Sequence, residues 1–311
     1  MILTEHFSGT LNTRRFRGIN IWKDIIIMET IKSLDSLSFE SLFLAFNRAF
    51  SDYEIQINRE ELSVMLSRRG FVPSLSFGLF EDDNLISFTV NGIGEFNGEK
   101  TAYDTGTGTL KDFRGKGLAS KIFEDSIPFL KEAGISQYLL EVLQHNTGAV
   151  SVYKKLGFTV SREFNYFTQL CSSVKIPEKN MASEYRIGEL SLERRREFEH
   201  FCDFLPSWQN GFEAILRRDK DFKVLGAFKG QEIVGYCIFE PVSGDVTQIA
   251  VERKHRRRGI ASALLSEALK SNRHNSVKVI NTEMSCESLT LFLNSCGIPL
   301  KGKQFEMIKK L

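Results

Sequence analysis

The sequence predicts two successive α/β domains, each with a central mixed sheet flanked by helices. Three segments of the first half recur in the same order in the second half, which indicates a duplicated domain. In both halves, short stretches with the two-residue period of strands alternate with longer stretches of helical period. The chain has 311 residues, 42% of them hydrophobic and 26% charged, so each half is long enough to bury a core of its own.

The repeat consists of a predicted hairpin, a basic turn and a short segment that ends in glycine. The paired segments are residues 78–90 ("GLFEDDNLISFTV") with 226–238 ("GAFKGQEIVGYCI"), 112–120 ("DFRGKGLAS") with 254–262 ("KHRRRGIAS"), and 152–158 ("VYKKLGF") with 292–298 ("FLNSCGI"). Chance similarity would scramble this order, so we interpret the segments as parts of two copies of one domain.

The other elements also follow the same order in both copies. An amphipathic helical region precedes the hairpin, and a strand, the basic turn with its helix, a further strand, a short helix and closing strands come after it. The expected ranges, first copy and then second copy, are 38–50 and 191–205 for the opening helix, 101–110 and 245–251 for the strand before the turn, 119–134 and 261–272 for the helix after it, and 136–143 and 276–283 for the next strand.

The domain boundary is expected in residues 171–184, where polar residues, a proline and a lack of periodicity indicate a linker. The first domain then spans residues 28–170, and the second, more divergent domain spans 185–311. Residues 1–27 lack the apolar segment and cleavage site of a secretory signal. Either Met28 is therefore the natural start, or residues 1–27 form a loosely attached extension.

Composition argues against several classes of function. The 41 basic and 39 acidic residues nearly cancel, and no broad basic face with interleaved aromatics is visible, so we expect no nucleic-acid partner. No apolar run approaches the roughly 18–20 residues that span a bilayer, so we expect no membrane partner. The cysteines form no CxxC pair, which argues against a metal site and disulfides and suits mostly buried thiols in a reducing, cytoplasmic location. They are Cys171, Cys202, Cys237, Cys286 and Cys296.

A strand that runs into a glycine-rich turn and then a helix is typical of a phosphate site. Unpaired N–H groups at the helix start point outward at the positive end of the helix dipole, and glycine leaves room for an anion. The P-loop pattern fails because Lys116 is followed by Gly117, and Lys111 breaks the dinucleotide fingerprint. A solvated basic helix start is the alternative, but several cations at this end of a helix favour a bound anion.

Two motifs carry a resemblance to a known family. The pattern Arg-x-x-Gly-x-Ala occurs as Arg114, Gly117 and Ala119 in the first copy and as Arg256, Gly259 and Ala261 in the second. In the first copy a second motif follows, with Asn146, Ala149, Tyr153, Gly157 and Phe158. Together they resemble the GCN5-related N-acetyltransferase (GNAT) family, well over about residues 28–168 and less completely over 185–311. The resemblance implies two GNAT-like domains, each a central mixed, mostly antiparallel sheet flanked by helices.

The resemblance implies an acetyl-coenzyme A-dependent N-acetyltransferase that acetylates a primary amine by direct attack in a ternary complex. In this family the turn wraps the pyrophosphate of acetyl-coenzyme A, and amides of the preceding strand face the pantetheine and acyl group. The residues implied to bind the cofactor are Gly108, Thr109, Leu110, Arg114, Gly115, Lys116, Gly117, Leu118, Ala119, Ser120 and Asn146 in the first copy, and Ile249, Ala250, Val251, Arg256, Arg257, Arg258, Gly259, Ile260, Ala261 and Ser262 in the second.

Acyl transfer from a thioester needs an acid for the thiolate and a base for the amine. The resemblance makes Tyr153 the acid, which is chemically reasonable because a thiol pKa of roughly 8.5 lies near the roughly 10 of tyrosine. Asp104 and Glu141, on the strands before and after the turn, are both candidates for the base. A half-buried core position is the alternative for Tyr153.

The second copy departs from the motif where chemistry is expected. Leu293 stands at the position of Tyr153 and Cys286 at the position of Asn146. The second copy therefore binds acetyl-coenzyme A without the same protonation, uses another acid, or acts as a scaffold, and we expect the first copy to be the main catalytic domain. The alternative for the whole chain is a degenerate pair that senses coenzyme A or an acyl derivative. Trp208 either lines an acceptor cleft or packs, and the chain is expected to be a monomer or homodimer.

Overall fold

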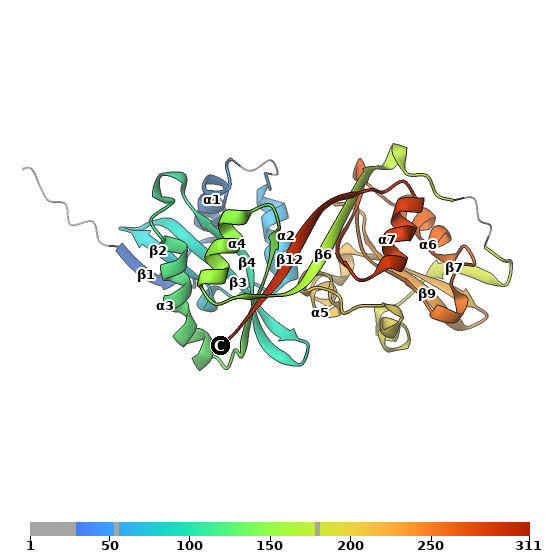
Figure 1. The fold of residues 1–311 in the computed structure, drawn as a ribbon, viewed down its shortest axis with the longest axis horizontal. Helices are drawn as coiled ribbons and strands as arrows, with labels where there is room; N and C mark the ends of the chain where they lie inside the picture. The colour runs from blue at the N-terminus through green and yellow to red at the C-terminus, as the bar shows by residue number, and fades with distance from the viewer. Residues whose placement is uncertain (1–28, 53–55, 178–180) are drawn as a thin grey trace, which may run out of the picture.

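The computed structural model describes residues 29–52, 56–177 and 181–311, so the interpretation of residues 1–27 lies outside the described residues. The strands of this part of the chain form one continuous sheet in the order β1-β2-β3-β4-β5-β12-β6-β11-β10-β9-β8-β7. Figure 1 shows two lobes, with α1 to α4 around the first, α6 and α7 on the second, and α5 where they meet. The predicted fold class, two α/β units with mostly antiparallel mixed sheets flanked by helices, is confirmed.

The strands are β1 (Glu29–Ser33), β2 (Phe77–Glu81), β3 (Asn84–Phe96), β4 (Glu99–Thr109), β5 (Gln137–Leu143), β6 (Thr159–Leu170), β7 (Tyr185–Glu189), β8 (Lys223–Lys229), β9 (Glu232–Glu240), β10 (Asp245–Val251), β11 (Ser276–Glu283) and β12 (Leu300–Lys310). The α-helices are α1 (Phe39–Ala49), α2 (Arg59–Arg69), α3 (Leu118–Glu132), α4 (Thr147–Lys155), α5 (Phe212–Leu216), α6 (Ile260–Leu269) and α7 (Glu287–Ser295).

The two copies exchange their last strands. β6, the last strand of the first copy, pairs with β11 of the second copy, and β12 pairs with β5 of the first copy. β6 and β12 also pair with each other, and Figure 1 shows them running side by side from one lobe to the other. Between them, Arg162 forms an ion pair with the buried Glu306 at 2.6 Å. Each half of the sheet is therefore completed by a strand of the other copy.

The predicted repeat is visible in the strand register. Gly108 pairs with Phe88 in the first copy, and the matching Ala250 pairs with Tyr236 in the second. Each copy also has a bulge at the same place, Thr105 on β4 and Thr247 on β10. Bulges re-aim side chains and are common beside functional sites, so their recurrence directs attention to this part of both strands.

The helix boundaries follow local signals. α2 begins after a capping box of Asn58 and Glu61 and ends at Gly70, whose φ of 79° is left-handed. This stop places Arg69 at the end of the helix, beside the sheet. One expected helix is wrong: residues 191–205 form two 3-10 turns, Leu192–Glu197 and Glu199–Phe201, in place of an amphipathic α-helix.

The expectation that most of the cysteines are buried is confirmed. All five are free thiols, and Cys237, Cys286 and Cys296 are buried while Cys171 and Cys202 are partly exposed. Burial raises the pKa of Cys237 to about 12. Among the helices that the structure describes, none combines the length and apolar content that crossing a bilayer requires.

Candidate active site

The strands before and after the first basic turn, β4 and β5, are paired at one end only. Their parallel pairing joins Thr101–Tyr103 with Gln137–Leu139. Beyond Tyr103 the strands diverge, and a cavity of about 320 Å³ lies beside their separated parts. We call this cavity the Tyr153 chamber. Its polar lining includes Arg69, Asp104, Glu141, Tyr153, Gln209 and Gln304.

The three residues predicted to be catalytic, Tyr153, Asp104 and Glu141, all line this chamber. The hydroxyl of Tyr153, on α4, donates a hydrogen bond to Oδ2 of Asp104 at 3.0 Å. Thr107 donates to the same oxygen at 2.8 Å. Burial raises the pKa of Asp104 to about 6, although both hydrogen bonds oppose this rise. A carboxylate with this pKa is ionised at neutral pH and still accepts a proton readily.

Glu141 is held by residues of the second copy. Its Oε2 accepts hydrogen bonds from Nε2 of Gln209 and from Nδ2 of Asn281, both at 2.6 Å. Burial raises the pKa of Glu141, whereas the nearby Arg69 and these two amides lower it. Gln209 lies in a 3-10 turn and Asn281 on β11, so the carboxylate sits where the two copies meet.

The first basic turn has the geometry of an anion cradle. Gly115 and Gly117 adopt left-handed φ angles of 77° and 75°, and a Cβ on either would have no atom within 4 Å. The amide of Lys121 makes the first bond of α3, to the carbonyl of Gly117 at 3.0 Å. The amides before it precede any helical acceptor and face the open side of the turn. These residues fit a phosphate group by their backbone.

The motif arginine of each turn, Arg114 or Arg256, is bound by an aspartate of its own copy. The guanidinium of Arg114 is bound to Asp52, with 2.8 Å between Nη2 and Oδ1, and to the carbonyl of Ala49. Arg256 makes the same arrangement with Asp203, with 2.8 Å between Nη1 and Oδ2. In both copies the arginine ties the turn to the segment after the opening helical region.

Other predicted cofactor residues are also placed by local packing. Leu110 and Leu118 are buried in the core, and the amide of Leu110 donates to the carbonyl of Ile86 at 2.9 Å, so of these two only Leu118, at the start of α3, offers its amide to a ligand. A Cβ on Gly108 would lie 2.6 Å from the ring of Phe88. The packing of this ring therefore accounts for glycine at position 108. Asn146 caps α4, with its Oδ1 accepting from the amide of Ala149 at 3.2 Å.

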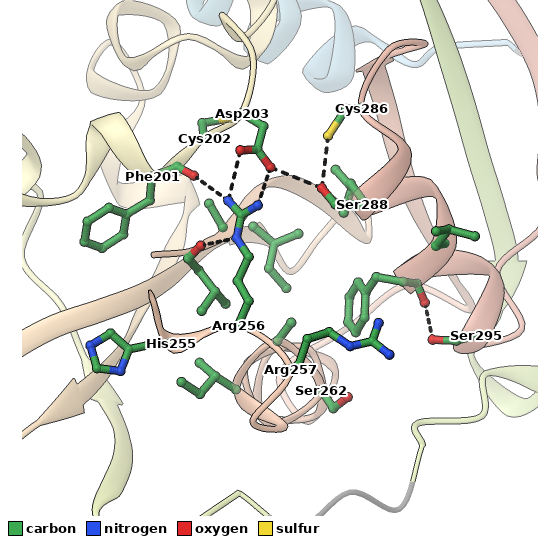
Figure 2. A pocket seen from close by; sticks show the side chains of 18 of the residues that line it. Phe201, Cys202, Asp203, His255, Arg256, Arg257, Ser262, Cys286, Ser288 and Ser295 are labelled. Atoms are coloured by element: carbon green, nitrogen blue, oxygen red, sulfur yellow. Dashed lines mark hydrogen bonds and ion pairs between the residues drawn. The ribbon is translucent and has the colours of Figure 1, made fainter. Parts of the chain in front are cut away.

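The second copy has a cavity of about 540 Å³ at its own basic turn, which we call the Arg257 cavity. Figure 2 shows Arg256 on its wall, turned to Asp203 and the carbonyl of Phe201, with Arg257 beside Ser262. Of the ten cofactor residues predicted here, all except Arg258 line the cavity. Arg258 instead lies 3.7 Å from Glu184. Arg257 has a φ of 63°, the left-handed conformation of its counterpart Gly115.

The second copy lacks the chemistry of the first. Its counterparts of Asp104, Glu141 and Tyr153 are Val246, Asn281 and Leu293. β10 and β11 also diverge after one parallel pair, Asp245 with Lys278. The space between them shrinks to a cavity of about 20 Å³, lined by side chains such as Phe204 and Asn210. In the second copy, an open cavity at the basic turn therefore adjoins a cleft that side chains fill.

One cluster in the second copy has the residue types of a metal site, although no metal was expected. Ligand atoms of Glu232, Glu252 and His255 lie within 4.8 Å of one another. Lys254 already bridges the two carboxylates, at 2.8 Å and 3.1 Å. Its ammonium supplies the positive charge that a cation would bring.

Three residues of the site escaped the sequence reasoning, namely Arg69, Gln209 and Gln304. Arg69 donates to Gln209 Oε1 at 2.7 Å and to the carbonyl of Thr105 at 3.1 Å. No local motif points to them, because two belong to the other copy. Trp208 packs: its ring stacks on Tyr103 at 5.2 Å and its Nε1 donates to the carbonyl of Arg69.

Comparisons with known proteins match both copies of the chain. The profile of the acetyltransferase (GNAT) family matches twice, at residues 39–158 and 186–287. The chain is 24% identical over 132 residues to the N-alpha-acetyltransferase MAK3 of Arabidopsis thaliana, which covers 42% of this chain and 68% of that protein.

Solved structures show the same fold over nearly the whole chain. A GCN5-related N-acetyltransferase from Sphaerobacter thermophilus aligns with a TM-score of 0.68 and 14% identity, covering 91% of this chain and 95% of that one. A tandem GNAT protein from the clavulanic acid biosynthesis pathway aligns with a TM-score of 0.69 and 9% identity, covering 91% and 98%. At such identities the likeness concerns the fold, including its two-copy arrangement.

Proposed function

The chain belongs to the acetyltransferase (GNAT) family, and from this premise we propose that it is an acetyl-coenzyme A-dependent N-acetyltransferase with a primary amine as acceptor. The first copy performs the transfer by direct attack of the amine in a ternary complex. The observation that carries this proposal is the hydrogen bond of Tyr153 to Asp104 inside the chamber. β4, which supplies Asp104, Thr105 and Thr107 to this chamber, leads directly into the glycine turn.

Some residues of the chain bind the cofactor, and others hold the binding turn in position. The amides of Gly115 to Ser120 hold the pyrophosphate, aided by the dipole of α3. Arg114 keeps the turn in place through Asp52 and is a positioning residue. The diverging strands β4 and β5 then leave the thioester between them, with its carbonyl facing the backbone at the end of β4 near Gly108 and Thr109. The amide of Leu110 does not serve it, because it donates to the carbonyl of Ile86 at 2.9 Å.

Asp104 and Tyr153 form a relay for the proton that leaves the attacking nitrogen. Asp104 accepts this proton, for which its pKa of about 6 is suitable. Tyr153 gives its own proton to the departing thiolate and takes the proton of Asp104 in return. Their 3.0 Å contact permits this exchange without moving either side chain far.

The second copy is proposed to bind coenzyme A or an acyl derivative without transferring an acyl group. Its Arg257 cavity is open, whereas the adjoining cleft measures about 20 Å³ and Leu293 has no acidic proton. This part of the chain follows the sensor or scaffold alternative. The cytoplasm, where acetyl-coenzyme A is made available to such enzymes, remains the proposed location.

The first experiment is an assay of free thiol released from acetyl-coenzyme A in the presence of amines. The panel contains small aliphatic and aromatic amines and a peptide with a free α-amine, since one similar protein is named an N-alpha-acetyltransferase. We expect release with at least one amine. Tight binding of coenzyme A without any release would instead favour the sensor for the whole chain.

A matched pair of variants decides which copy transfers the acetyl group. Ser120 and Ser262 occupy equivalent positions in the first turn of α3 and α6. Glutamate there suits the helix dipole but repels a bound pyrophosphate. Ser120→Glu should raise KM for acetyl-coenzyme A by about tenfold or more, whereas Ser262→Glu should remove only a second coenzyme A bound in equilibrium dialysis. The reverse pattern would assign catalysis to the second copy.

A further inference from the structure

Asn281 occupies in the second copy the place that Glu141 has in the first, because residues 276–283 align with 136–143. The two equivalent side chains meet across the join of the copies, where Nδ2 of Asn281 donates to Oε2 of Glu141 at 2.6 Å. Asn281 of the second copy thus contacts the carboxylate of the residue with which it aligns in the first copy, Glu141. The contact links the second copy directly to the Tyr153 chamber.

The backbone of Asn281 is shaped for this contact. A bulge between Val279 and Thr282 interrupts the pairing of β11 with β6, and Asn281 within it has a left-handed φ of 56°. Its side chain is 1% exposed and fully used. Nδ2 also donates to Ser207 at 2.9 Å, and Oδ1 accepts from Gln304 at 2.7 Å. Strained, buried residues of this kind concentrate at functional sites.

Gln209 supplies a second donor to the same carboxylate oxygen. Its Nε2 donates to Oε2 of Glu141, and its Oε1 accepts from Arg69, which fixes the direction of the amide. Two N–H donors therefore converge on Oε2. The other oxygen, Oε1, is buried and accepts from neither amide. A proton taken up by Glu141 must accordingly reside on Oε1. Two further titratable groups face this carboxylate: the buried hydroxyl of Tyr103, whose pKa Glu141 helps to raise, and Glu306, whose charge raises the pKa of Glu141.

We infer that Gln209 and Asn281 are positioning residues that prepare Oε1 of Glu141 to receive the acceptor's ammonium group and its first proton. The inference rests on the proposed function. An amine in water arrives largely as an ammonium ion, which must lose one proton before attack and a second one afterwards. Two carboxylates in one chamber match these two protons, Glu141 for the first and Asp104 for the second.

The protons and bonds balance in this scheme. One N–H bond of the ammonium breaks as an O–H bond forms at Oε1 of Glu141, and this proton later passes to water. The free amine attacks the thioester carbon, and the C–S bond breaks. The second proton goes to Asp104 and, through Tyr153, to the thiolate. The products are the amide, the free thiol and one proton in water.

The chamber also indicates the kind of amine. One part of its wall is apolar, formed by Phe46, Phe50, Ile57 and Met65, while polar side chains that include Arg69 form the rest. Its volume of about 320 Å³ lies at the small end of ligand sites. These walls and carboxylates together fit a small monocationic amine on an apolar carbon skeleton. 2-Phenylethylamine is a suitable probe, and 2-phenylethanol is its neutral counterpart.

The test is the carboxyl ¹³C titration of Glu141, assigned with Glu141→Gln, in the full-length protein. Asn281→Gly keeps the left-handed backbone without strain and removes one donor, and Gln209→Met removes the other. Each should move the titration midpoint of Glu141 to higher pH, because a lost N–H donor destabilises the carboxylate. Asn210→Ser is the control, since Asn210 lies in the same turn but donates to the carbonyl of Ile280.

An unchanged midpoint in folded Gln209→Met or Asn281→Gly would overturn the inference, as would an equal shift in Asn210→Ser. The ¹³C chemical shift of the Glu141 carboxyl should also change on addition of 2-phenylethylamine and not on addition of 2-phenylethanol. The opposite result would show that Oε1 of Glu141 does not bind the ammonium group. In the thiol assay, kcat/KM of either donor variant should fall about tenfold on the acid limb and under threefold at pH 9. Absence of turnover with every amine would refute the proposed function, while the titration would still decide the role of the two amides.

Discussion

The two copies share a scaffold and differ in what the scaffold holds. Both have the strand bulge at Thr105 or Thr247 and the arginine–aspartate pair behind a left-handed turn. The first copy has a chamber of about 320 Å³ with two carboxylates and a tyrosine, whereas the corresponding cleft of the second measures about 20 Å³. At the turn the second copy has the open cavity of about 540 Å³.

Under the proposed function, this difference means that holding a ligand and reacting with it are divided between the two copies. The turn depends on backbone amides and glycine, which survive many side-chain changes. The chemistry depends on a few side chains that have become Val246, Asn281 and Leu293 in the second copy. The second copy nevertheless contributes to the first, through the exchanged β12 and the amides on Glu141.

The largest expected effect separates the copies by their acid. Tyr153→Phe removes the proton donor of the first copy, and the second copy has only Leu293 to replace it. We expect kcat to fall by about 10² to 10³-fold, in the range of general acid catalysis. Steady-state thiol release at saturating substrates measures this. Tyr166→Phe, which removes a hydroxyl from β6, is the control, and a loss below threefold in Tyr153→Phe would make the tyrosine a packing residue.

The second effect concerns the cost of the buried carboxylate. The pKa of Asp104 rises from 3.8 to about 6 on folding, chiefly through burial. The folded protein then binds this proton more tightly, so the group's contribution to stability is full below about pH 4 and is lost as the pH rises through about 6. Asparagine has no such dependence. Relative to the native protein, Asp104→Asn should gain about 2 kcal/mol between pH 4 and pH 7.

Thermal unfolding at several pH values measures this gain, with Asp112→Asn, at an exposed position of the turn, as the control. If the plots of stability against pH for Asp104→Asn and for the native protein run parallel across this range, burial does not raise the pKa of Asp104. The second copy has Val246 here, so the first copy alone is expected to bear the cost.

The elements that were predicted correctly are those whose conformation is set by residues within the same segment of the sequence. The strand, glycine turn and helix at 101–134 follow from periodicity and from Gly115 and Gly117, and the counterpart in the second copy follows from alignment. The opening helix of the second copy failed because residues 191–205 carry the apolar spacing of a helix yet fold into 3-10 turns. Spacing alone does not distinguish these two states.

Features without a local cause were not predictable. The exchange of β6 and β12 depends on which sheet edge each strand meets, and a linear boundary at 171–184 contains no information on it. The role of Asp52 and Asp203 as partners of the motif arginines had a weak signal, because an aspartate follows the opening helical region in both copies. Asn281 had a signal too, since it aligns with Glu141, but only the bulge brings the two together.

The smallest expected effect compares the same backbone conformation in the two turns. Gly115 and Arg257 occupy equivalent positions with φ of 77° and 63°. A left-handed conformation costs a residue with a Cβ about 1 kcal/mol, whereas glycine adopts it freely. Gly115→Arg should therefore lower the melting temperature slightly, and Arg257→Gly should raise it or leave it unchanged, because the more flexible unfolded chain offsets part of the gain.

The proposed binding of coenzyme A to the second copy gives arginine a role at this strained position. Arg257 lines the cavity of the second copy, so Arg257→Gly should weaken coenzyme A binding there while the melting temperature of the free protein is maintained. Differential scanning calorimetry with and without coenzyme A measures both quantities on one sample. If Arg257→Gly lowers the melting temperature more than Gly115→Arg does, the left-handed turn is not the strained element, and the difference between the copies at this position lies in packing rather than in binding.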